Sequence, residues 1–222
     1  MKKILYIGDS TVQFYNIHSY PQTGMSQALM LFVAKNVQVC HHARGGRSTK
    51  SFLAEGRFEP VKQAIQEGDF LFIQFGHNDE KPDEYRHTEP YGSFQENLRY
   101  YIQTARSVGA YPVLITPIAR CLFDENGQLK CGTHGEYPEA IRQLGRAEGI
   151  PVVDMTAISE AYLQSLSMED AKKLYIDGAH LLPDGAVKMT GFLCGVLEKL
   201  GKPYSDILCK PEVDTQAPDL AP

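Results

Sequence analysis

The sequence predicts an α/β protein, a three-layer α/β/α sandwich built on a five-stranded, doubly wound parallel sheet. Apolar runs of strand length alternate with helix-period segments along almost the whole chain, which is typical of parallel strands joined by crossover helices. The apolar runs are mostly unbroken, as in strands covered on both faces. Right-handed crossovers then favour helices on both sides of the sheet. The predicted strands span residues 3–7, 36–41, 69–75, 111–116 and 150–155.

The clearest predicted helix spans residues 93–108, where apolar side chains recur at the spacing of one helical face. Ser93 and Glu96 have the spacing of a capping box at its start. Gly109 then stands where a left-handed residue ends a helix. The other predicted helices are weaker and span residues 22–35, 60–67, 137–148, 156–167 and 184–200.

One domain is expected to hold most of the chain, because the 222 residues compare with about 150 per domain. We expect this domain to span residues 1–201. Residues 202–222 contain four prolines and lack periodicity, which favours an extended, Pro-rich C-terminal tail. Such a tail wraps the body or makes oligomer contacts, and the sequence favours neither.

Charge and hydropathy exclude several classes of protein. The 22 Lys and Arg against 27 Asp and Glu give a net charge of −5, which disfavours a nucleic-acid binder. The first apolar run meets Gly8 after residues 4–7, whereas a secretory signal needs about 7 to 15 apolar residues. No run of about 18 uncharged apolar residues is available to cross a membrane. We therefore expect a soluble, cytoplasmic protein with no nucleic-acid or membrane partner, and an oligomer is possible.

The five cysteines cannot all pair within one chain, and none forms a C-x-x-C motif. Reduced thiols in a cytosolic protein are the favoured interpretation. A disulfide between Cys121 and Cys131 remains an alternative, because these residues flank a turn-like segment at 124–127.

Ser10 is the first candidate for chemistry. The segment Gly8-Asp9-Ser10-Thr11 follows the first predicted strand, and a doubly wound fold exposes side chains to a crevice at the carboxyl ends of its strands. The alternative is that Asp9 and Ser10 only cap or turn the chain. The pentapeptide G-x-S-x-G is absent because position 12 is Val, so the nucleophile elbow of the other large hydrolase fold is not supported.

Two glycine-containing loops supply candidate hydrogen-bond donors. Arg44-Gly45-Gly46-Arg47-Ser48 follows the second predicted strand, and Gly76-His77-Asn78-Asp79 follows the third. Acyl transfer needs donors aimed at the oxygen that becomes negative, and a backbone N–H or a side-chain amide suits this role. Each loop by itself is as well explained by an ordinary turn.

Asp177 and His180 are the third candidate group. A carboxylate three residues before an imidazole can accept from one ring nitrogen and leave the other free to act as a base. This pair fits the order of nucleophile, base and orienting group in serine catalysis. The alternative is a turn aspartate beside a surface histidine.

The four segments together resemble the SGNH (GDSL-type) hydrolases, and within them the rhamnogalacturonan acetylesterase family of carbohydrate esterases, family 12. The resemblance spans about residues 3–200. It implies a flavodoxin-like sheet of the SGNH-hydrolase type. The motifs that carry it are Gly8-Asp9-Ser10-Thr11, Gly46-Arg47-Ser48, Gln74-Phe75-Gly76-His77-Asn78-Asp79 and Asp177-x-x-His180.

The resemblance also implies residue roles. Ser10 is implied as the nucleophile, with Asp177 and His180 as the rest of a catalytic triad. Gly46 and Asn78 are implied as oxyanion donors, together with the amide of Ser10. No metal or organic cofactor is implied. The neighbours His41 and His42 would point to opposite faces of a strand, so a shared metal is geometrically awkward.

Substrate contacts are a weaker expectation. Arg44, Arg47 and Lys50 gather positive charge beside the glycine donor, which suits uronate carboxylates of a pectic backbone. Arg47 is expected to contact substrate, although it could instead brace its loop. His134, in the loop after the fourth strand, is the second expected contact, and a plain surface loop is the alternative.

The favoured function is therefore a serine esterase that deacetylates pectic oligosaccharides through an acetyl-serine intermediate. Its only expected partner is an acetylated oligosaccharide substrate. A different SGNH esterase, such as a thioesterase or lysophospholipase, is the alternative within enzymes, but the polar insertion at residues 80–90 favours an open, hydrated cleft over an acyl tunnel. A non-catalytic glycan-binding module on the same fold is the alternative from another class.

Overall fold

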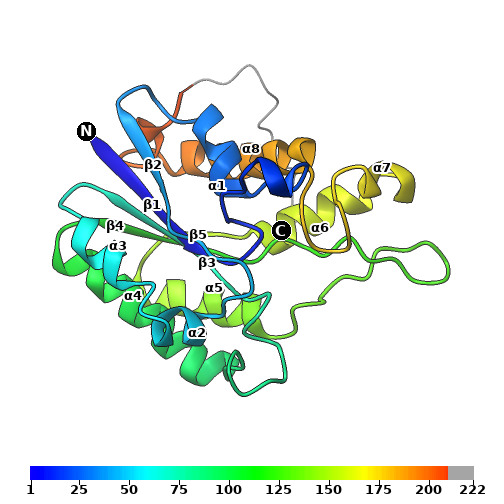
Figure 1. Cartoon of the computed structure of the whole chain (residues 1–222), viewed down its shortest axis with the longest axis horizontal. Helices are drawn as coiled ribbons and strands as arrows, with labels where there is room; N and C mark the ends of the chain where they lie inside the picture. Colours follow the sequence, from blue (N-terminus) through cyan, green and yellow to red (C-terminus); the bar gives the residue numbers. More distant parts are fainter. Residues whose placement is uncertain (210–222) are drawn as a thin grey trace.

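The computed structural model describes residues 1–209 and contains one five-stranded sheet. All neighbouring strands are parallel, in the order β2-β1-β3-β4-β5. This confirms the predicted fold class and places β3 at the centre of the sheet, between β1 and β4 (Figure 1). The strands are β1 (Lys2–Gly8), β2 (Val37–His41), β3 (Phe70–Gln74), β4 (Tyr111–Ile115) and β5 (Val152–Val153).

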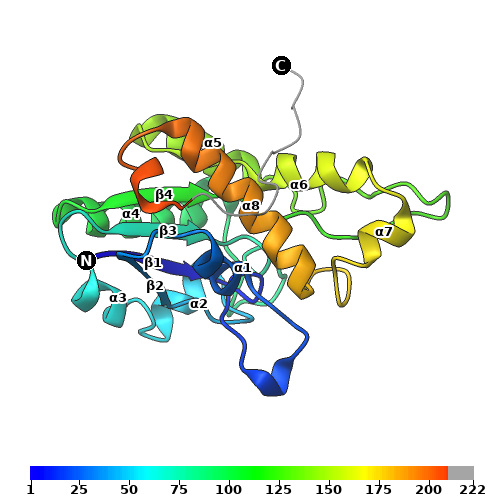
Figure 2. The same cartoon turned by 90° about the horizontal axis from the view of Figure 1, so that it is seen from above.

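Helices cover both faces of the sheet, as Figure 1 and the view from above in Figure 2 show. Helices α2, α3, α4 and α5 lie on one side, and α1 and α8 lie on the other. The α-helices are α1 (Met25–Ala28), α2 (Thr49–Ala54), α3 (Glu59–Ala64), α4 (Gln95–Ser107), α5 (Tyr137–Glu148), α6 (Met155–Gln164), α7 (Met168–Lys172) and α8 (Pro183–Leu200).

Alternate residues of each strand enter different hydrophobic cores, because successive strand side chains point to opposite faces. Ile4 and Tyr6 of β1 join the core under α1, α6 and α8, whereas Leu5 and Ile7 join the core under α2, α3, α4 and α5. All four side chains are fully buried. An unbroken apolar run is therefore what a central strand of this sheet requires.

The region of the predicted helix at 22–35 folds differently. α1 is a single turn that continues as a 3₁₀ segment, Leu29–Leu31, and the chain then leaves the helical path toward β2. Two short helices, α2 and α7, were not predicted. Ser48 caps α2 by accepting from the Ser51 backbone N–H, and Ser51 Oγ accepts from the Ser48 N–H in return. Serine takes the place of the usual Glu or Gln in this box, so the sequence signature is weak.

The start of α4 corrects another expectation. Ser93 does not form a capping box with Glu96, because its hydroxyl accepts a hydrogen bond from the backbone N–H of Glu89 at 3.0 Å. It lies within a kinked turn, Pro90–Phe94, that precedes α4 and in which Gly92 has non-helical backbone angles. The other end of α4 is as predicted: Gly109 has a φ of +76° and its N–H bonds to the carbonyl of Arg106.

The chain after α8 packs back on the domain as far as it is described. A 3₁₀ turn, Ser205–Ile207, places the Ile207 side chain at 0% exposure. Leu208 forms an antiparallel bridge with Val33, and the Cys209 N–H bonds to the Phe32 carbonyl at 2.8 Å. The described part of the expected tail therefore packs against the domain, and residues 210–222 lie outside the described residues.

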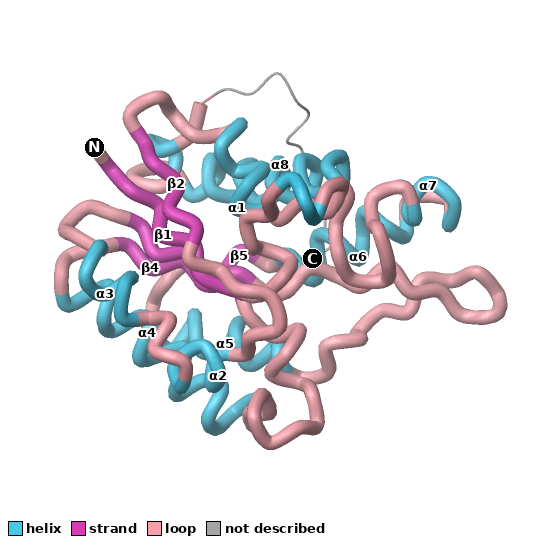
Figure 3. Tube along the Cα trace, viewed as in Figure 1, coloured by secondary structure: helices cyan, strands magenta, loops and turns pink. Residues whose placement is uncertain are grey.

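Two further expectations concern thiols and membranes. All five cysteines are free, so Cys121 and Cys131 are not bridged. Within residues 1–209, no helix combines the length and the apolar character needed to cross a bilayer. The loop between β4 and α5, which contains both Cys121 and Cys131, extends away from the sheet (Figure 3).

We predict that Ile207→Ala destabilises the domain by about 2–5 kcal/mol, the range found when a buried Ile side chain is truncated. The reason is that Ile207 is buried between α8 and the segment leading to β2. Urea unfolding measures the change. Asp206→Ala, at an exposed neighbouring position, is the matched control and should change stability by less than about 0.5 kcal/mol. Equal effects of the two substitutions would contradict a packed C-terminal segment.

Candidate active site

Three of the predicted segments meet because of strand order. β1 lies between β2 and β3, so the loops that follow these three strands leave the same edge of the sheet side by side. The Arg44 N–H bonds to the Gly8 carbonyl at 2.9 Å, which joins the loop after β2 to the end of β1. The sheet itself therefore brings Ser10, Gly46 and Asn78 to one place.

A tight turn presents Ser10 at the end of β1. The Asp9 carbonyl accepts from the N–H groups of Val12 and Gln13, at 3.2 and 3.1 Å. The buried Asp9 carboxylate accepts from the N–H and the hydroxyl of Thr11, at 2.9 and 2.8 Å. Burial raises the pKa of Asp9, although the hydrogen bonds from Thr11 oppose this. Asp9 thus closes the turn from inside and leaves the Ser10 side chain facing outward.

Ser10, His180 and Asp177 form one chain of hydrogen bonds. Ser10 Oγ lies 2.9 Å from His180 Nε2, and His180 Nδ1 lies 2.8 Å from Asp177 Oδ2. The other carboxylate oxygen, Asp177 Oδ1, accepts from the backbone N–H groups of Ala179 and His180, each at 2.7 Å. Burial favours a raised pKa at Asp177, but the hydrogen bonds from His180 and Ala179 outweigh it and lower the pKa. Asp177 is therefore held as a carboxylate.

A small hairpin carries Asp177 and His180. Its two sides are joined by the antiparallel bridge of Tyr175 with Leu181, and the Ile176 N–H bonds to the His180 carbonyl at 2.8 Å. From the loop after β4, the Cys121 N–H bonds to the Gly178 carbonyl at 3.0 Å. The hairpin and the loop after β4, neither of which is part of the sheet, thus hold the His180 imidazole next to the turn that carries Ser10.

Neutral donors lie beside Ser10. The Gly46 N–H has no protein acceptor within residues 1–209, and the φ of +77° at this residue is one that side-chain-bearing residues avoid. Asn78 Nδ2 donates to the Arg47 carbonyl at 3.2 Å, and its Oδ1 accepts from Arg86. An amide NH₂ group has two donors, so the second N–H of Asn78 is available to a ligand.

Gln13 and Tyr15 support this arrangement, and sequence reasoning did not identify them. Gln13 Oε1 accepts from the Gly45 N–H at 2.6 Å, which fixes the donor loop against the Ser10 turn. The Tyr15 hydroxyl donates to the Ser10 carbonyl at 2.8 Å, and burial raises the pKa of Tyr15. Neither residue belongs to a sequence motif with a chemical meaning, because each side chain bonds to a backbone group, that of Gly45 or that of Ser10, which any residue type would supply.

Asp79 joins the loop that carries Asn78 to the loop that carries Gly46. Its carboxylate oxygen Oδ1 accepts from the Thr49 N–H at 2.9 Å and the Thr49 hydroxyl at 2.6 Å, and also from the Thr88 hydroxyl. Asp79 is fully buried, and burial raises its pKa to about 7. Asp79 directly follows Asn78, so its bonds to Thr49 fix the loop that carries Asn78 to the start of α2. Gly46 lies in the loop just before that helix.

A cavity of about 390 Å³ opens above these groups. It contains the Ser10 and His180 side chains and the Gly46 and Asn78 donors, so an ester placed in it would meet all of them. Ala179 is the only lining residue with a purely aliphatic side chain within the described range. Its lining consists of Ser10, Gly45, Gly46, His77, Asn78, Lys81, Arg120, Ala179 and His180.

The two expected substrate contacts do not line this cavity. His134 is a correction: its side chain is fully buried, with Nε2 2.9 Å from the Ile118 carbonyl and Nδ1 3.3 Å from Glu80. Arg47 acts as a brace, the alternative that its sequence position left open. Its Nε bonds to both oxygens of Glu55, at 3.0 and 3.1 Å, and its Nη1 bonds to the Gly45 carbonyl at 2.8 Å.

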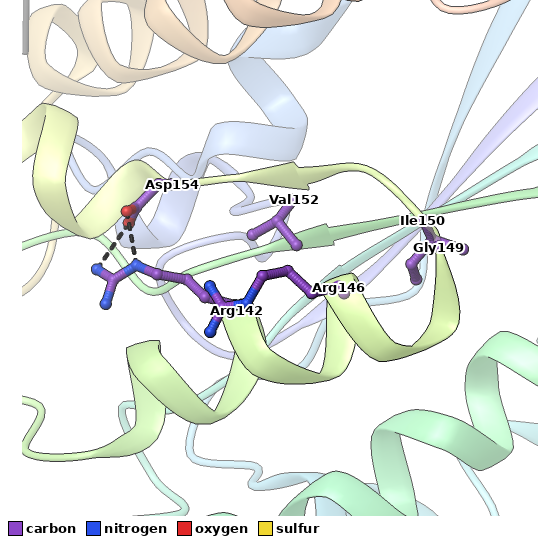
Figure 4. A pocket seen from close by; sticks show the side chains of 7 residues that line it. Arg142, Arg146, Gly149, Ile150, Val152 and Asp154 are labelled. Atoms are coloured by element: carbon purple, nitrogen blue, oxygen red, sulfur yellow. Dashed lines mark hydrogen bonds and ion pairs between the residues drawn. The ribbon is translucent and has the colours of Figure 1, made fainter. Parts of the chain in front are cut away.

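A second hollow of about 420 Å³ lies between α5 and β5 and has a different character (Figure 4). Two of its polar side chains already pair with each other, because Arg142 forms two hydrogen bonds with Asp154, at 2.7 and 3.1 Å. It contains neither a nucleophile nor an imidazole among its lining residues. Metal ligands are also lacking, since no cluster of three or more His, Cys, Asp or Glu suited to a metal ion occurs in residues 1–209.

A parallel α/β sandwich that joins a serine, an imidazole and a carboxylate by hydrogen bonds has the architecture of a serine hydrolase. The chain belongs to the GDSL-like Lipase/Acylhydrolase family, whose model matches residues 6–187. It is 36% identical to rhamnogalacturonan acetylesterase RhgT of Bacillus subtilis (strain 168), over 96% of this chain and 97% of that protein. It is 35% identical to probable rhamnogalacturonan acetylesterase YesY of the same organism, over 93% of this chain and 97% of that protein.

Solved structures agree with the fold. The crystal structure of protein YxiM from Bacillus subtilis superposes with a TM-score of 0.82 at 28% identity, covering 91% of this chain and 57% of that one. Axe2, an acetylxylan esterase from Geobacillus stearothermophilus, superposes with a TM-score of 0.64 at 18% identity, covering 91% of this chain and 95% of that one. At that identity, the likeness to Axe2 is evidence of a shared fold alone.

We predict that Asp79→Ala destabilises the protein by about 1–3 kcal/mol for each buried donor left unpaired at Thr49. Asp79→Asn keeps an acceptor oxygen, so its loss should be smaller, and it removes the titration of this group. The pKa of Asp79 rises from 3.8 to about 7 on burial, so between these pH values the folded protein binds a proton that the unfolded chain does not.

Because the folded protein holds this extra proton, Asp79 makes the free energy of unfolding fall as pH rises from 3.8 to about 7. Urea unfolding at several pH values, for the wild type and for Asp79→Asn, measures this contribution as a difference in slope. Identical slopes for the two proteins would show that burial does not shift the pKa of the Asp79 carboxyl group.

Proposed function

We propose that this chain is a serine acetylesterase that removes acetyl groups from rhamnogalacturonan-type pectic oligosaccharides. The observation that carries this proposal is the hydrogen-bonded chain from Ser10 Oγ through His180 to Asp177, with distances of 2.9 and 2.8 Å. The substrate class rests on the relatives of 36% and 35% identity, which are named a rhamnogalacturonan acetylesterase and a probable rhamnogalacturonan acetylesterase.

The first half-reaction transfers the acetyl group to Ser10. His180 Nε2 removes the Ser10 hydroxyl proton as Oγ attacks the carbonyl carbon of the acetyl ester. Asp177 holds the opposite ring nitrogen, keeps the ring in the required tautomer and stabilises the imidazolium that forms. The tetrahedral intermediate collapses when the imidazolium gives its proton to the sugar oxygen, which leaves as an alcohol.

Three neutral donors receive the charge of the intermediate. They are the backbone N–H groups of Ser10 and Gly46 and the free amide N–H of Asn78. Each is held by its surroundings before substrate binds, so little reorganisation accompanies the reaction, and such donors typically contribute about 3–4 kcal/mol each. Neutral donors also leave the nearby imidazole free to become positively charged.

The second half-reaction regenerates the enzyme. Water loses a proton to His180 and attacks the acetyl carbonyl on Ser10, and the same donors stabilise the second intermediate. Acetate then leaves as the proton returns to Ser10 Oγ. Acylation and deacylation thus use the same atoms in the same places.

The cavity lining favours a small acyl group. Ala179 is its single aliphatic side chain within the described residues, whereas the long acyl chain of a lysophospholipid or thioester needs an extended apolar wall. A non-catalytic glycan-binding module would have no use for a serine joined to an imidazole and a carboxylate. Action within the cell and any oligomer remain predictions.

We predict that the wild type releases acetate from acetylated rhamnogalacturonan oligosaccharides faster than from acetylated xylan. Ser10→Ala and His180→Ala should each lower kcat by about 10⁴-fold or more, and the double variant should be no worse than the single ones, because the two residues act as one unit. Acetate release under saturating substrate measures all four proteins. Preference for xylan would overturn the pectic substrate, and fully additive losses would overturn the shared mechanism.

We predict that Asn78→Ala lowers kcat by about 10²–10³-fold with little change in KM, because the amide meets charge that develops only in the transition state. Asn78→Asp should lose at least as much, since a carboxylate offers no donor and repels the oxyanion. Asn126→Ala, at an exposed position in the loop after β4, is the control and should retain wild-type kinetics. A loss confined to KM would assign Asn78 to substrate binding.

A further inference from the structure

The cavity at Ser10 has an unbalanced positive charge. Two of its lining side chains are cationic, Lys81 and Arg120, and no lining residue within the described range is a carboxylate. The chain as a whole has a net charge of −5, so this local excess runs against the overall charge. The two cations differ in what surrounds them.

The charge of Arg120 is already neutralised within the protein. Its guanidinium forms an ion pair with Glu80 and donates to the Thr133 carbonyl at 2.9 Å. Burial favours a raised pKa at Glu80, but hydrogen bonds from His134 and Arg120 lower it, so Glu80 is a carboxylate. The Arg120 side chain is only 16% exposed. It therefore belongs to a closed ion-pair network in the wall of the cavity.

Lys81 has a fixed backbone, and its charge has no partner among residues 1–209. Its N–H donates to the Asn78 carbonyl at 3.1 Å, and its own carbonyl accepts from His87 Nδ1 at 3.1 Å. Its Nζ has no hydrogen bond or ion pair to any residue in the range 1–209. The Lys81 charge also contributes to lowering the pKa of His77, which lines the same cavity. The ammonium thus acts on the space that the ester must enter.

We propose that Lys81 is a specificity-determining residue of this site, whose ammonium group binds a carboxylate of the substrate close to the acetyl ester. This inference rests on the proposed acetylesterase function and adds a residue to it. A lysine is a compact charge on a flexible stem, so it suits a carboxylate whose orientation varies between sugars. A neutral sugar forms no ion pair with Lys81, so the Lys81 charge discriminates between substrates with a carboxylate and substrates without one.

The test compares Lys81→Met with the wild type on two matched substrates. One is an acetylated rhamnogalacturonan oligosaccharide, and the other is the same oligosaccharide after its uronates are converted to methyl esters. We expect Lys81→Met to lower kcat/KM about tenfold on the charged substrate, mainly through KM. Its activity on the methyl-esterified substrate and on p-nitrophenyl acetate should stay within about twofold of the wild type. The wild-type preference should shrink as salt screens the pair.

A matched control is Lys130→Met, which removes a lysine that does not line the cavity and should leave all three activities unchanged. Equal losses on charged and uncharged substrates would overturn the proposal and assign Lys81 to the reacting carbonyl. Unchanged kinetics on the charged substrate would also overturn it.

A binding measurement separates this proposal from the esterase mechanism. Calorimetry on Ser10→Ala, with and without Lys81→Met, compares the affinity for the charged and the methyl-esterified oligosaccharides without turnover. A tenfold difference that vanishes on methyl esterification supports carboxylate binding even if the wild type releases no acetate. The absence of any difference overturns the role of Lys81, whereas a wild type without acetate release overturns only the proposed reaction.

Discussion

The buried carboxyl group of Asp79 joins the two loops on which the donor site depends. Its bonds to the N–H and hydroxyl of Thr49 connect the loop after β3 to the first turn of α2. The Ser48 capping box fixes that turn from the other side. Gly46 and Asn78 lie in loops that follow strands which do not pair with each other, so the sheet brings the two loops to one edge and this connection fixes one loop to the other. A preorganised donor pair requires such a buried link.

The core strands could be predicted because their physics is local. A strand covered on both faces must be apolar at successive positions, and residues 4–7 and 70–73 show this directly. Helix details depended on contacts that a local pattern does not contain. The hydroxyl of Ser93 accepts from the Glu89 N–H within a kinked turn, and α1 gives way after one turn to the 3₁₀ segment Leu29–Leu31.

The chemical segments were predictable for a different reason. Ser10, Asn78, Asp177 and His180 lie in short motifs whose residue types have few other joint explanations. In the structure, Ser10, Asn78 and His180 line one cavity, and Asp177 is hydrogen-bonded to His180. His134 was misplaced because a loop position does not reveal burial: its partner Glu80 comes from a loop on another strand. Sequence reasoning did not single out Lys81, because a lysine in a polar insertion is usually a solvated surface charge.

The hairpin that carries both Asp177 and His180 makes the acid and the base a single mechanical unit. Carboxylate, ring and two backbone N–H groups are bonded across three residues, so any displacement of the hairpin carries them together. One gap is then left to vary, the distance from the imidazole to Ser10. Substitutions at residues that hold the hairpin would therefore change the rate of turnover through this one distance, while the hydrogen bonds between Asp177 and His180 stay the same.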